Sequence, residues 1–271
     1  MTALITALII LVALAALLLF LLAGRRNHPG LEKLRGWSYA HRGLHGEGIP
    51  ENSMAAFRRA LEHGYGIELD VHLMKDGELA VVHDSSLKRT AGADVKIEDL
   101  TKEDLEKYPL EGTEETIPLF KEVLALYAGK APLIVELKPE KGNHAALSKA
   151  TCDLLESYDG AYCLESFDPR CIRWLKKNRP ELIRGQLSEN WLKTKNDLPW
   201  PIAFALTYNL LNFWTSPDFI AYKFADRNTT ANYYCRKVWK LTGVSWTIKN
   251  KEDFDAAVKE GWLPIFEGFT P

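Results

Sequence analysis

The sequence has little cysteine, and its four cysteines form no metal-binding pattern. They stand among apolar neighbours at positions Cys152, Cys163, Cys171 and Cys235. This spacing matches no zinc motif, and the neighbours indicate small residues of a packed core. Nothing in the pattern requires a disulfide.

An excess of charge of one sign is also lacking. The chain has 34 Lys and Arg residues against 36 Asp and Glu residues, so its formal net charge is -2. This balance excludes the basic footprint of a nucleic-acid-binding domain. No internal repeat is visible, and no low-complexity tract follows the N-terminus. What the chain does have is 271 residues, 46% of them hydrophobic, which suffices for one large α/β domain.

The N-terminus carries one long apolar run, from Leu4 to Leu22, whose only polar residue is Thr6. A run of this length spans a bilayer as a helix. A buried helix of a soluble domain would show a polar face, and this run has none. No Lys or Arg precedes it, although a cleaved signal peptide usually begins with a basic region. The run therefore predicts a membrane anchor.

Basic residues follow the run directly, at Arg25 and Arg26. The positive-inside rule then predicts a single-pass protein of the cell membrane with its main domain in the cytoplasm. We expect three parts: a transmembrane anchor over residues 1–24, a linker over 25–36 and one domain over 37–271.

The main domain alternates candidate strands with candidate helices, which favours a parallel sheet with helical crossovers. Eight strands are predicted to start at Ser38, Gly66, Leu133, Ala161, Leu182, Phe219, Val244 and Leu263. Among the helices between them, one is expected over residues 206–214. Eight such units predict a TIM (β/α)8 barrel, with a small insertion over residues 85–117 after the second strand.

The second predicted strand carries two acids, Glu68 and Asp70. Alternate side chains of a strand share a face, so the two carboxylates point the same way. Burying them together is costly unless a cation is present, and Ca²⁺ and Mg²⁺ prefer carboxylate oxygens. The alternative is a strand whose acids face only water.

Active sites of TIM barrels lie at the carboxyl ends of the strands. Polar and aromatic residues stand on or just after six of the predicted strands. They are His41, Arg42, Glu68, Asp70, Glu136, Lys138, Lys223, Trp246 and Glu267. The barrel geometry is expected to bring these residues together although they are far apart in the chain.

Several of these residues belong to ordered motifs that resemble the glycerophosphodiester phosphodiesterases. The motifs are His41-Arg42-Gly43, Pro50-Glu51-Asn52-Ser53, Glu68-Leu69-Asp70-Val71, Lys75-Asp76-Gly77, Val82-His83-Asp84, Leu87 with Arg89-Thr90, Ile117-Pro118 and Glu136-Leu137-Lys138. The likeness is dense over residues 37–140 and continues weakly through Ser166-Phe167-Asp168-Pro169 and Ser245-Trp246-Thr247.

The resemblance implies a TIM barrel that hydrolyses glycerophosphodiesters to glycerol 3-phosphate and an alcohol, with a divalent metal, Ca²⁺ or Mg²⁺. The family's metal ligands fall on Glu68, Asp70 and Glu136. Its paired catalytic histidines fall on His41 and His83, and its phosphate-binding positions on Arg42 and Lys138. Trp246 is expected to pack against the glycerol or the leaving group.

The residue types suit this chemistry. A cation held by three carboxylates neutralises charge on phosphate oxygens, and basic side chains donate directly to them. Two histidines suit two proton transfers, since imidazole titrates near neutral pH. The resemblance allows the nucleophile to be a substrate hydroxyl, which gives a cyclic phosphate that water then opens. Which histidine acts first stays open.

The sequence departs from the family's pattern after the last predicted strand. Many relatives have a Thr-Asp pair after the last strand, where this chain has Phe266-Glu267-Gly268, so Glu267 receives no role. The segment 189–216 is rich in Trp, Leu and Asn, and is expected to shape an apolar leaving-group pocket or a contact with the membrane.

Two other functions stay open. One is a lysophospholipase D-like enzyme, in which the aromatic segment accepts an acyl chain. The other is a non-catalytic membrane module that binds phosphate headgroups. The complete set of His41, His83 and three carboxylates favours an enzyme.

Overall fold

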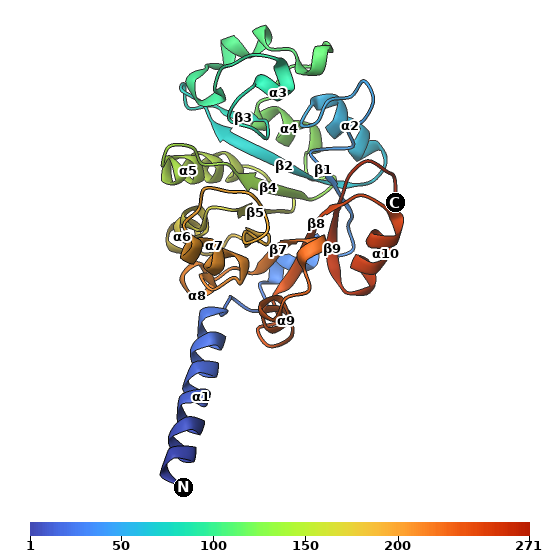
Figure 1. The fold of residues 1–271 in the computed structure, drawn as a ribbon. Helices are drawn as coiled ribbons and strands as arrows, with labels where there is room; N and C mark the ends of the chain where they lie inside the picture. The colour runs from blue at the N-terminus through green and yellow to red at the C-terminus, as the bar shows by residue number, and fades with distance from the viewer.

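A computed structural model describes residues 1–271 and shows a closed barrel with one helix projecting from it (Figure 1). The strands are β1 (Tyr39–His41), β2 (Gly66–Leu73), β3 (Leu79–Val81), β4 (Leu133–Leu137), β5 (Tyr162–Ser166), β6 (Arg184–Ser188), β7 (Phe219–Lys223), β8 (Thr242–Ile248) and β9 (Trp262–Phe266). All pairs are parallel except β2 with β3. Because β1 pairs with both β9 and β2, the eight parallel strands close into a TIM barrel.

Helices cover the outside of the barrel. The α-helices are α1 (Thr2–Leu21), α2 (Met54–Glu62), α3 (Lys88–Ala91), α4 (Phe120–Tyr127), α5 (His144–Leu155), α6 (Pro169–Asn178), α7 (Trp200–Thr207), α8 (Asn212–Thr215), α9 (Thr230–Lys237) and α10 (Lys251–Lys259). Short 3-10 helices are η1 (Pro29–Leu34), η2 (Ile97–Asp99), η3 (Lys102–Lys107), η4 (Leu110–Gly112) and η5 (Phe224–Asp226).

The predicted eight-stranded barrel is confirmed, and each predicted strand lies within two residues of an observed start. The helix predicted over residues 206–214 is wrong. The structure has α7 and α8 there, separated by a turn in which Asn209 adopts a positive φ of 54°. A left-handed residue interrupts an α-helix, and the apolar composition of this segment gave no periodicity that would locate the break.

Side chains alternate between two cores. On β4, Leu133, Val135 and Leu137 pack outward against the helices, whereas Ile134 joins a smaller cluster inside the barrel. All four cysteines are buried and free, as expected of small core residues.

The insertion after β2 forms a subdomain with its own core. Residues 85–117 contain α3 and three 3-10 helices, and the short strand β3 precedes them. Its buried apolar side chains include Leu87, Ile97, Leu105 and Leu110. The charged and irregular sequence of this region therefore still folds around a small cluster of leucine and isoleucine.

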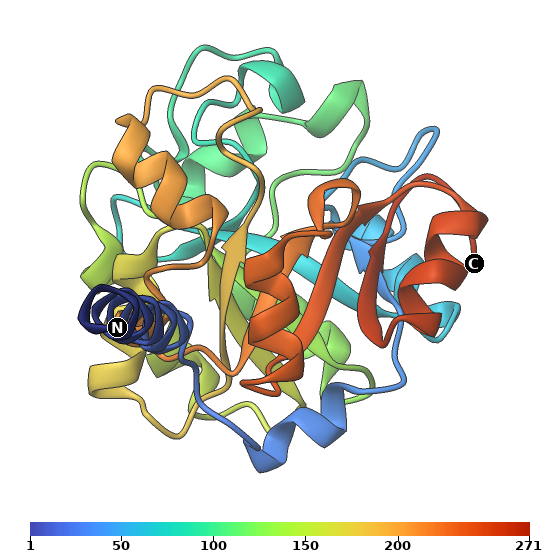
Figure 2. The same cartoon turned by 60° about the horizontal axis from the view of Figure 1, so that its bottom comes forward.

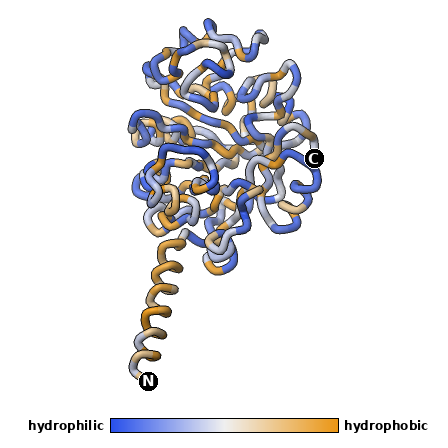
Figure 3. Tube along the Cα trace, in the orientation of Figure 1, coloured by the Kyte–Doolittle hydropathy of each residue, from blue (hydrophilic) through white to orange (hydrophobic).

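The N-terminal helix α1 extends away from the barrel and is apolar along its whole length (Figure 3). By length and composition it is one candidate membrane span or signal sequence. Its C-terminal end is docked on the barrel. Trp239 Nε1 donates to the Leu19 carbonyl at 2.9 Å, and Leu22 is fully buried in the main core. Arg25 forms an ion pair with the buried Asp218 at 2.6 Å.

The segment predicted as a linker, residues 25–36, contacts the barrel throughout. Leu31 and Leu34 of η1 join the cluster inside the barrel, at the amino ends of the strands. Tyr39 Oη donates to the Leu34 carbonyl at 2.7 Å. This segment therefore closes the end of the barrel opposite the predicted active site.

Replacing Leu34 tests this closure. Leu34→Ala leaves a cavity among buried apolar side chains, so we expect it to lower the free energy of unfolding by about 2–5 kcal/mol. The measurement is the thermal unfolding midpoint of the full chain in detergent. Val258→Ala, at a half-exposed position on α10, is the control and should change stability by less than about 0.5 kcal/mol. Equal midpoints for the two variants would show that η1 is not part of the folded barrel.

Candidate active site

The register of the strands brings the predicted site residues together. His41 stands opposite Glu68 on β2, and Asp70 stands opposite Glu136 on β4. Glu136 in turn stands opposite Glu165 on β5. Because residues in register on adjacent strands point to the same side of a sheet, the interior of the barrel receives four carboxyl groups at the carboxyl ends of the strands.

Three of these acids form a compact cluster. Glu68, Asp70 and Glu136 are buried, and one oxygen from each lies within 4.8 Å of the others. Lys138 Nζ lies 2.9 Å from Glu136 Oε1 and 3.2 Å from Asp70 Oδ1. Arg42 Nε lies 3.4 Å from Asp70 Oδ2. The structure thus places five of the predicted site residues in one group.

Burial raises the pKa values of these acids, whereas the neighbouring basic groups lower them. Burial raises the pKa of Glu68 well above its usual range, and the neighbouring Asp70 and Glu136 raise it further. Burial also raises the pKa of Glu136, to about 7, against the opposing charge of Lys138. For Asp70 the burial effect is outweighed by Lys138, His83 and Arg42, which hold its pKa far below the usual range. The cluster without a metal therefore stays partly protonated near neutral pH.

Each predicted catalytic histidine is held by a carboxylate. His41 Nδ1 lies 2.5 Å from Glu267 Oε2, and its Nε2 lies 3.9 Å from Glu68 Oε2. His83 Nδ1 lies 2.7 Å from Asp84 Oδ1. A carboxylate on Nδ1 favours the tautomer with its proton there and leaves Nε2 free to accept or donate a proton.

The pKa values of the histidines favour the neutral form. Burial lowers the pKa of His41, although the bond from Glu267 opposes this effect. Burial lowers the pKa of His83 to about 4. The bond from His41 lowers the pKa of Glu267 to about 2, so Glu267 is ionised at neutral pH.

A tight turn after β1 orients Arg42. Arg42 has a positive φ of 54° and Gly43 one of 81°. A Cβ on Gly43 would lie 2.8 Å from Ala56 Cβ, so only glycine fits between this turn and α2. Arg42 donates to Glu51 at 2.9 Å. A left-handed arginine is unusual, and such strain is common at functional sites.

The Pro50-Glu51-Asn52-Ser53 motif braces this turn and begins α2. Asn52 Nδ2 donates to Asp70 Oδ2 at 2.9 Å, and Ser53 Oγ accepts from the Ala56 amide as the N-cap of α2. Arg89 of α3 donates to both Glu51 and Asp84. A continuous chain of ion pairs therefore links the insertion, the His83 loop and the carboxylate cluster.

Two adjoining cavities open at this end of the barrel. A small one of about 40 Å³ reaches His41, Glu68, His83 and Trp246. A wider one of about 360 Å³ includes His72, His83, Lys138 and Phe167. Trp246 contacts Phe167 edge-to-face at 5.5 Å, and this pair forms the apolar wall of the site.

His72, Lys223 and His45 lie around this group. His72 of β2 is buried and lies with Nδ1 2.6 Å from Glu98 of the insertion. Lys223 pairs with Glu189 at 2.9 Å rather than with the carboxylate cluster. His45, in the loop after β1, lies close to His41 and Glu267.

Sequence reasoning missed one further acid and left another without a role. Glu165 is almost fully buried, lines the small cavity and has no hydrogen-bond partner for Oε2. Burial and the neighbouring Glu136 raise its pKa well above the usual range. The only feature of the sequence that could have identified Glu165 as a site residue was its position on a predicted strand, where its side chain points into the barrel. Glu267 was noticed but received no role, and the structure places it on His41.

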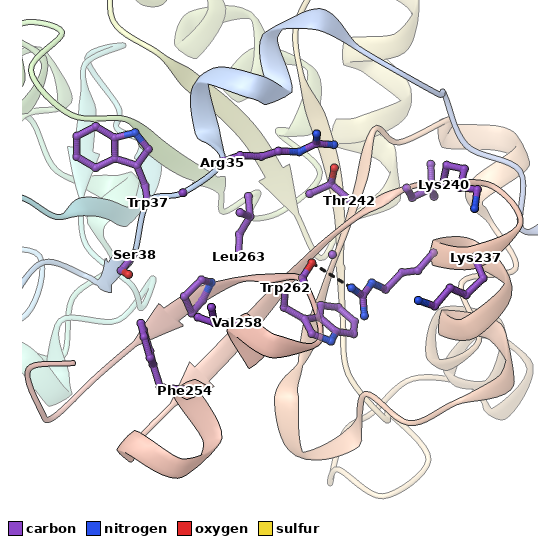
Figure 4. Close-up of a pocket in the computed structure, with 16 residues that line it drawn as sticks. Arg35, Trp37, Ser38, Lys237, Lys240, Thr242, Phe254, Val258, Trp262 and Leu263 are labelled. Atoms are coloured by element: carbon purple, nitrogen blue, oxygen red, sulfur yellow. Dashed lines mark hydrogen bonds between the residues drawn. The ribbon is translucent and has the colours of Figure 1, made fainter. Parts of the chain in front are cut away.

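A larger cavity of about 640 Å³ lies away from this site (Figure 4). It is lined by the starts of β8 and β9, by the residues before β1 and by α9 and α10. Because these are the amino ends of the strands, this cavity lies at the opposite end of the barrel from the carboxylates.

The carboxylate cluster fits a divalent metal. Three buried carboxylates offer oxygens at mutual distances that one ion can bridge, and oxygen ligands of this kind suit Ca²⁺ and Mg²⁺. Without an ion, the raised pKa values of Glu68 and Glu136 show that bound protons must substitute for part of its charge.

Comparison with known proteins agrees with this geometry. The model of the glycerophosphoryl diester phosphodiesterase family matches residues 41–261. A glycerophosphodiester phosphodiesterase of Caldanaerobacter subterraneus subsp. tengcongensis is 31% identical over 238 residues, which cover 82% of this chain and 89% of that protein. The lysophospholipase D GDPD1 of Homo sapiens is 35% identical over 133 residues, and the match covers 44% of this chain and 41% of that protein.

Solved structures confirm the fold. A phosphodiesterase of Oleispira antarctica, crystallised with the product sn-glycerol-3-phosphate, has a TM-score of 0.71 and 21% identity, covering 85% of this chain and 92% of that one. A glycerophosphodiester phosphodiesterase of Thermotoga maritima has a TM-score of 0.67 and 21% identity, covering 86% and 95%.

Metal binding should release protons and tighten as the pH rises. The pKa of Glu136 is raised to about 7, and metal ligands must be deprotonated to bind. Isothermal titration of the full chain with Ca²⁺ and with Mg²⁺ is expected to show affinity rising from about pH 6 to about pH 8, with proton release seen in buffers of different ionisation enthalpy.

Two variants test the assignment of the metal ligands. Glu68→Gln should weaken metal binding by at least about 100-fold, the upper end of what second-shell changes cost. Glu140→Gln, which removes a carboxylate at the mouth that pairs with Lys96, should bind metal like the wild type. A pH-independent affinity, or equal affinities for the two variants, would contradict the proposed ligand set.

Proposed function

Because the chain belongs to the glycerophosphoryl diester phosphodiesterase family of hydrolases, we propose that it hydrolyses glycerophosphodiesters to glycerol 3-phosphate and an alcohol at the site formed by His41 and His83. The observation that carries this proposal is the pair of neutral histidines, each with Nδ1 held by a carboxylate, beside a buried carboxylate cluster.

In this mechanism, Glu68, Asp70 and Glu136 would hold a divalent metal, Ca²⁺ or Mg²⁺. When bound, the metal stabilises negative charge on the phosphate oxygens. Arg42 and Lys138 donate to the same phosphate, since both basic groups face the cluster and charge-assisted bonds to phosphate are strong. Their fixed positions orient the diester before any bond changes.

The two histidines transfer the protons. The histidine that acts as the base accepts the proton of the nucleophile at Nε2. The other histidine first takes up a proton from solvent at Nε2 and then donates it to the leaving alkoxide. Glu267 and Asp84 stabilise the imidazolium that each histidine forms in turn. Trp246 and Phe167 wall the cavity, so they are placed to contact the glycerol or the leaving group.

We also propose that α1 is a retained anchor, with residues 25–36 as the connection to a domain of residues 37–271 and the insertion at 85–117. Leu22 lies in the main core, and a Cβ on Gly24 would lie 2.6 Å from the Pro217 carbonyl oxygen. Cleavage after the apolar run would remove or disturb these contacts. Arg25 and Arg26 then favour a single-pass cell-membrane protein with a cytoplasmic barrel.

A second candidate function is lysophospholipase D-like hydrolysis of single-chain lipids. Apolar side chains at Trp200, Ile202 and Phe204 of α7 remain exposed on the barrel, and this observation favours substrates that carry an acyl chain. The chemistry at His41 and His83 is the same in both candidates.

The test is hydrolysis by the full chain in detergent, measured as release of glycerol 3-phosphate from glycerophosphodiesters and of lysophosphatidate from a lysophospholipid. The substrates are glycerophosphocholine, glycerophosphoethanolamine and glycerophosphoglycerol, each with Ca²⁺, Mg²⁺ or chelator, beside a lysophospholipid. We expect metal-dependent turnover, and a loss of kcat of about 10²–10⁴-fold in His41→Ala and His83→Ala, the usual range for general acid–base groups. His63→Ala, on the exposed end of α2, should match the wild type.

Each outcome of this assay is informative. Turnover of the lysophospholipid alone would select the second candidate. No turnover by a folded, metal-loaded protein would contradict the enzyme and leave a module that binds phosphate headgroups.

Replacing Glu267 tests its link to His41. The Glu267 carboxylate raises the pKa of His41, so Glu267→Gln should lower that pKa further. The limb of the kcat/KM profile that reports His41 should therefore move to lower pH, whether His41 acts as the acid or as the base. We also expect kcat to fall by about 10–100-fold, within the range for second-shell partners. Glu252→Gln, an exposed acid on α10, is the control, and identical profiles would refute the link.

A further inference from the structure

Large exposed apolar side chains are concentrated on one part of the barrel. Apart from those on α1, they are Leu192, Leu198, Trp200, Ile202, Phe204, Tyr233, Val238 and Val258. All but Val258 belong to two short segments, 192–204 and 233–238. Scattered single residues of this kind are normal, whereas a contiguous group marks an interaction surface.

The helix α7 is the clearest case. Its sequence WPIAFALT contains one polar residue. Ala203, Leu206 and Thr207 pack inward, while Trp200 is 67% exposed and Ile202 46% exposed. A helix that is apolar on all sides is normally buried in protein or in lipid, and this one has nothing on its outer side.

This surface adjoins the last turns of α1. Leu18 lines a small apolar cavity together with Phe204, Tyr208 and Leu210 from the α7 region and Ala231 of α9. Phe20 contacts Phe213 at a ring distance of 5.3 Å. In Figure 2, α1 points toward the viewer, and α7 and α9 lie on the face of the barrel from which it projects. A membrane that surrounds α1 therefore meets these two helices.

Basic and aromatic side chains lie next to these apolar residues. Arg26 stacks over the Trp239 ring at 4.7 Å. The cavity of Figure 4 borders α9 and is lined by four basic side chains, those of Arg35, Arg236, Lys237 and Lys240, and by no acidic residue. Tryptophan and basic residues together are typical of segments that lie at the surface of an anionic membrane.

We propose that α7 and α9 form a bilayer-contact face, which lies in the headgroup region of an anionic membrane beside the end of α1. The proposal rests on the anchor that we assigned to α1 above. It adds a second, interfacial attachment that fixes how the barrel sits on the membrane.

The bilayer-contact face leads toward the active site. Leu192 follows Trp191, whose ring contacts Phe167 edge-to-face at 5.4 Å. Phe167 in turn contacts Trp246 inside the catalytic cavity. The segment 191–204 therefore runs from the bilayer-contact face to the wall of the site, with apolar residues at its two ends, 191–192 and 198–204, and a polar stretch at 193–197 between them. Its chemistry suits a single-chain lipid whose phosphodiester headgroup enters the cavity while its chain stays near α7.

Single cysteines test the contact directly. The four native cysteines are buried, so a spin label attached at Ile202→Cys reports that position alone. Glu252→Cys, at the exposed start of α10 and outside the cavity of Figure 4, is the control. The full chain is reconstituted into vesicles of phosphatidylcholine with phosphatidylglycerol. We expect the label at 202 to relax with lipid-soluble oxygen and the label at 252 with a water-soluble nickel complex.

A second measurement tests the route to the site. Trp200→Gln with Ile202→Gln should lower kcat/KM for lysophospholipid in the same vesicles by about tenfold or more, because two large apolar side chains no longer enter the lipid. Hydrolysis of water-soluble glycerophosphocholine should stay unchanged, and Glu252→Gln, at an exposed position outside the cavity of Figure 4, should change neither activity.

The outcomes separate the two proposals. Water-like relaxation at position 202, or a chain that does not stay with the vesicles, would overturn the bilayer-contact face even if soluble diesters are hydrolysed. An immobilised label at 202 that neither reagent reaches would indicate a protein partner instead and would also overturn it. Lipid contact at 202 with no hydrolysis of any diester would support the face while the proposed function fails.

Discussion

The structure depends on how it accommodates negative charge inside the barrel. Four carboxyl groups, those of Glu68, Asp70, Glu136 and Glu165, are buried beside two basic groups, those of Arg42 and Lys138. With all six ionised, two negative charges remain uncompensated. Isolated buried charges are very costly, so they are neutralised or paired. Two protons can balance the site, as the raised pKa values of Glu68 and Glu165 indicate, and one divalent cation provides the same charge.

The same constraint explains the surrounding network. Arg42 must reach Asp70 from a turn that only a glycine at position 43 permits, and Glu51 and Asn52 hold that turn in place. The histidines are oriented by carboxylates from opposite ends of the domain. Asp84 begins the insertion, whereas Glu267 follows β9 and meets His41 only because β1 pairs with β9. Barrel closure is therefore a condition for the catalytic arrangement.

Much of the fold and of the candidate site could be predicted from local patterns in the sequence. Alternation on the second strand placed Glu68 and Asp70 on one face, and the alternation of strands and helices predicted the barrel that brings Glu136 beside them. Glu165 was missed because a single acid on a short strand has no local partner, and only the register with Glu136 shows where it points. Glu267 was left without a role because its contact spans 226 residues. The break between α7 and α8 was missed because a uniformly apolar segment has no helical periodicity to interrupt.

The direction of α1 connects the site to its substrates. In Figure 1 the strands β2 and β4 run across the direction of α1, and the insertion with α3 lies at the opposite end of the molecule from α1. On the proposed anchoring, a bilayer around α1 would therefore lie along the side of the barrel, and the insertion would stand away from the lipid. Water-soluble diesters would reach the site from solution, whereas a lipid would have to leave the bilayer beside α1 and α7. The proposed distinction between the two substrate classes therefore rests on α7, because the groups assigned to catalysis would treat the phosphodiester of either class alike.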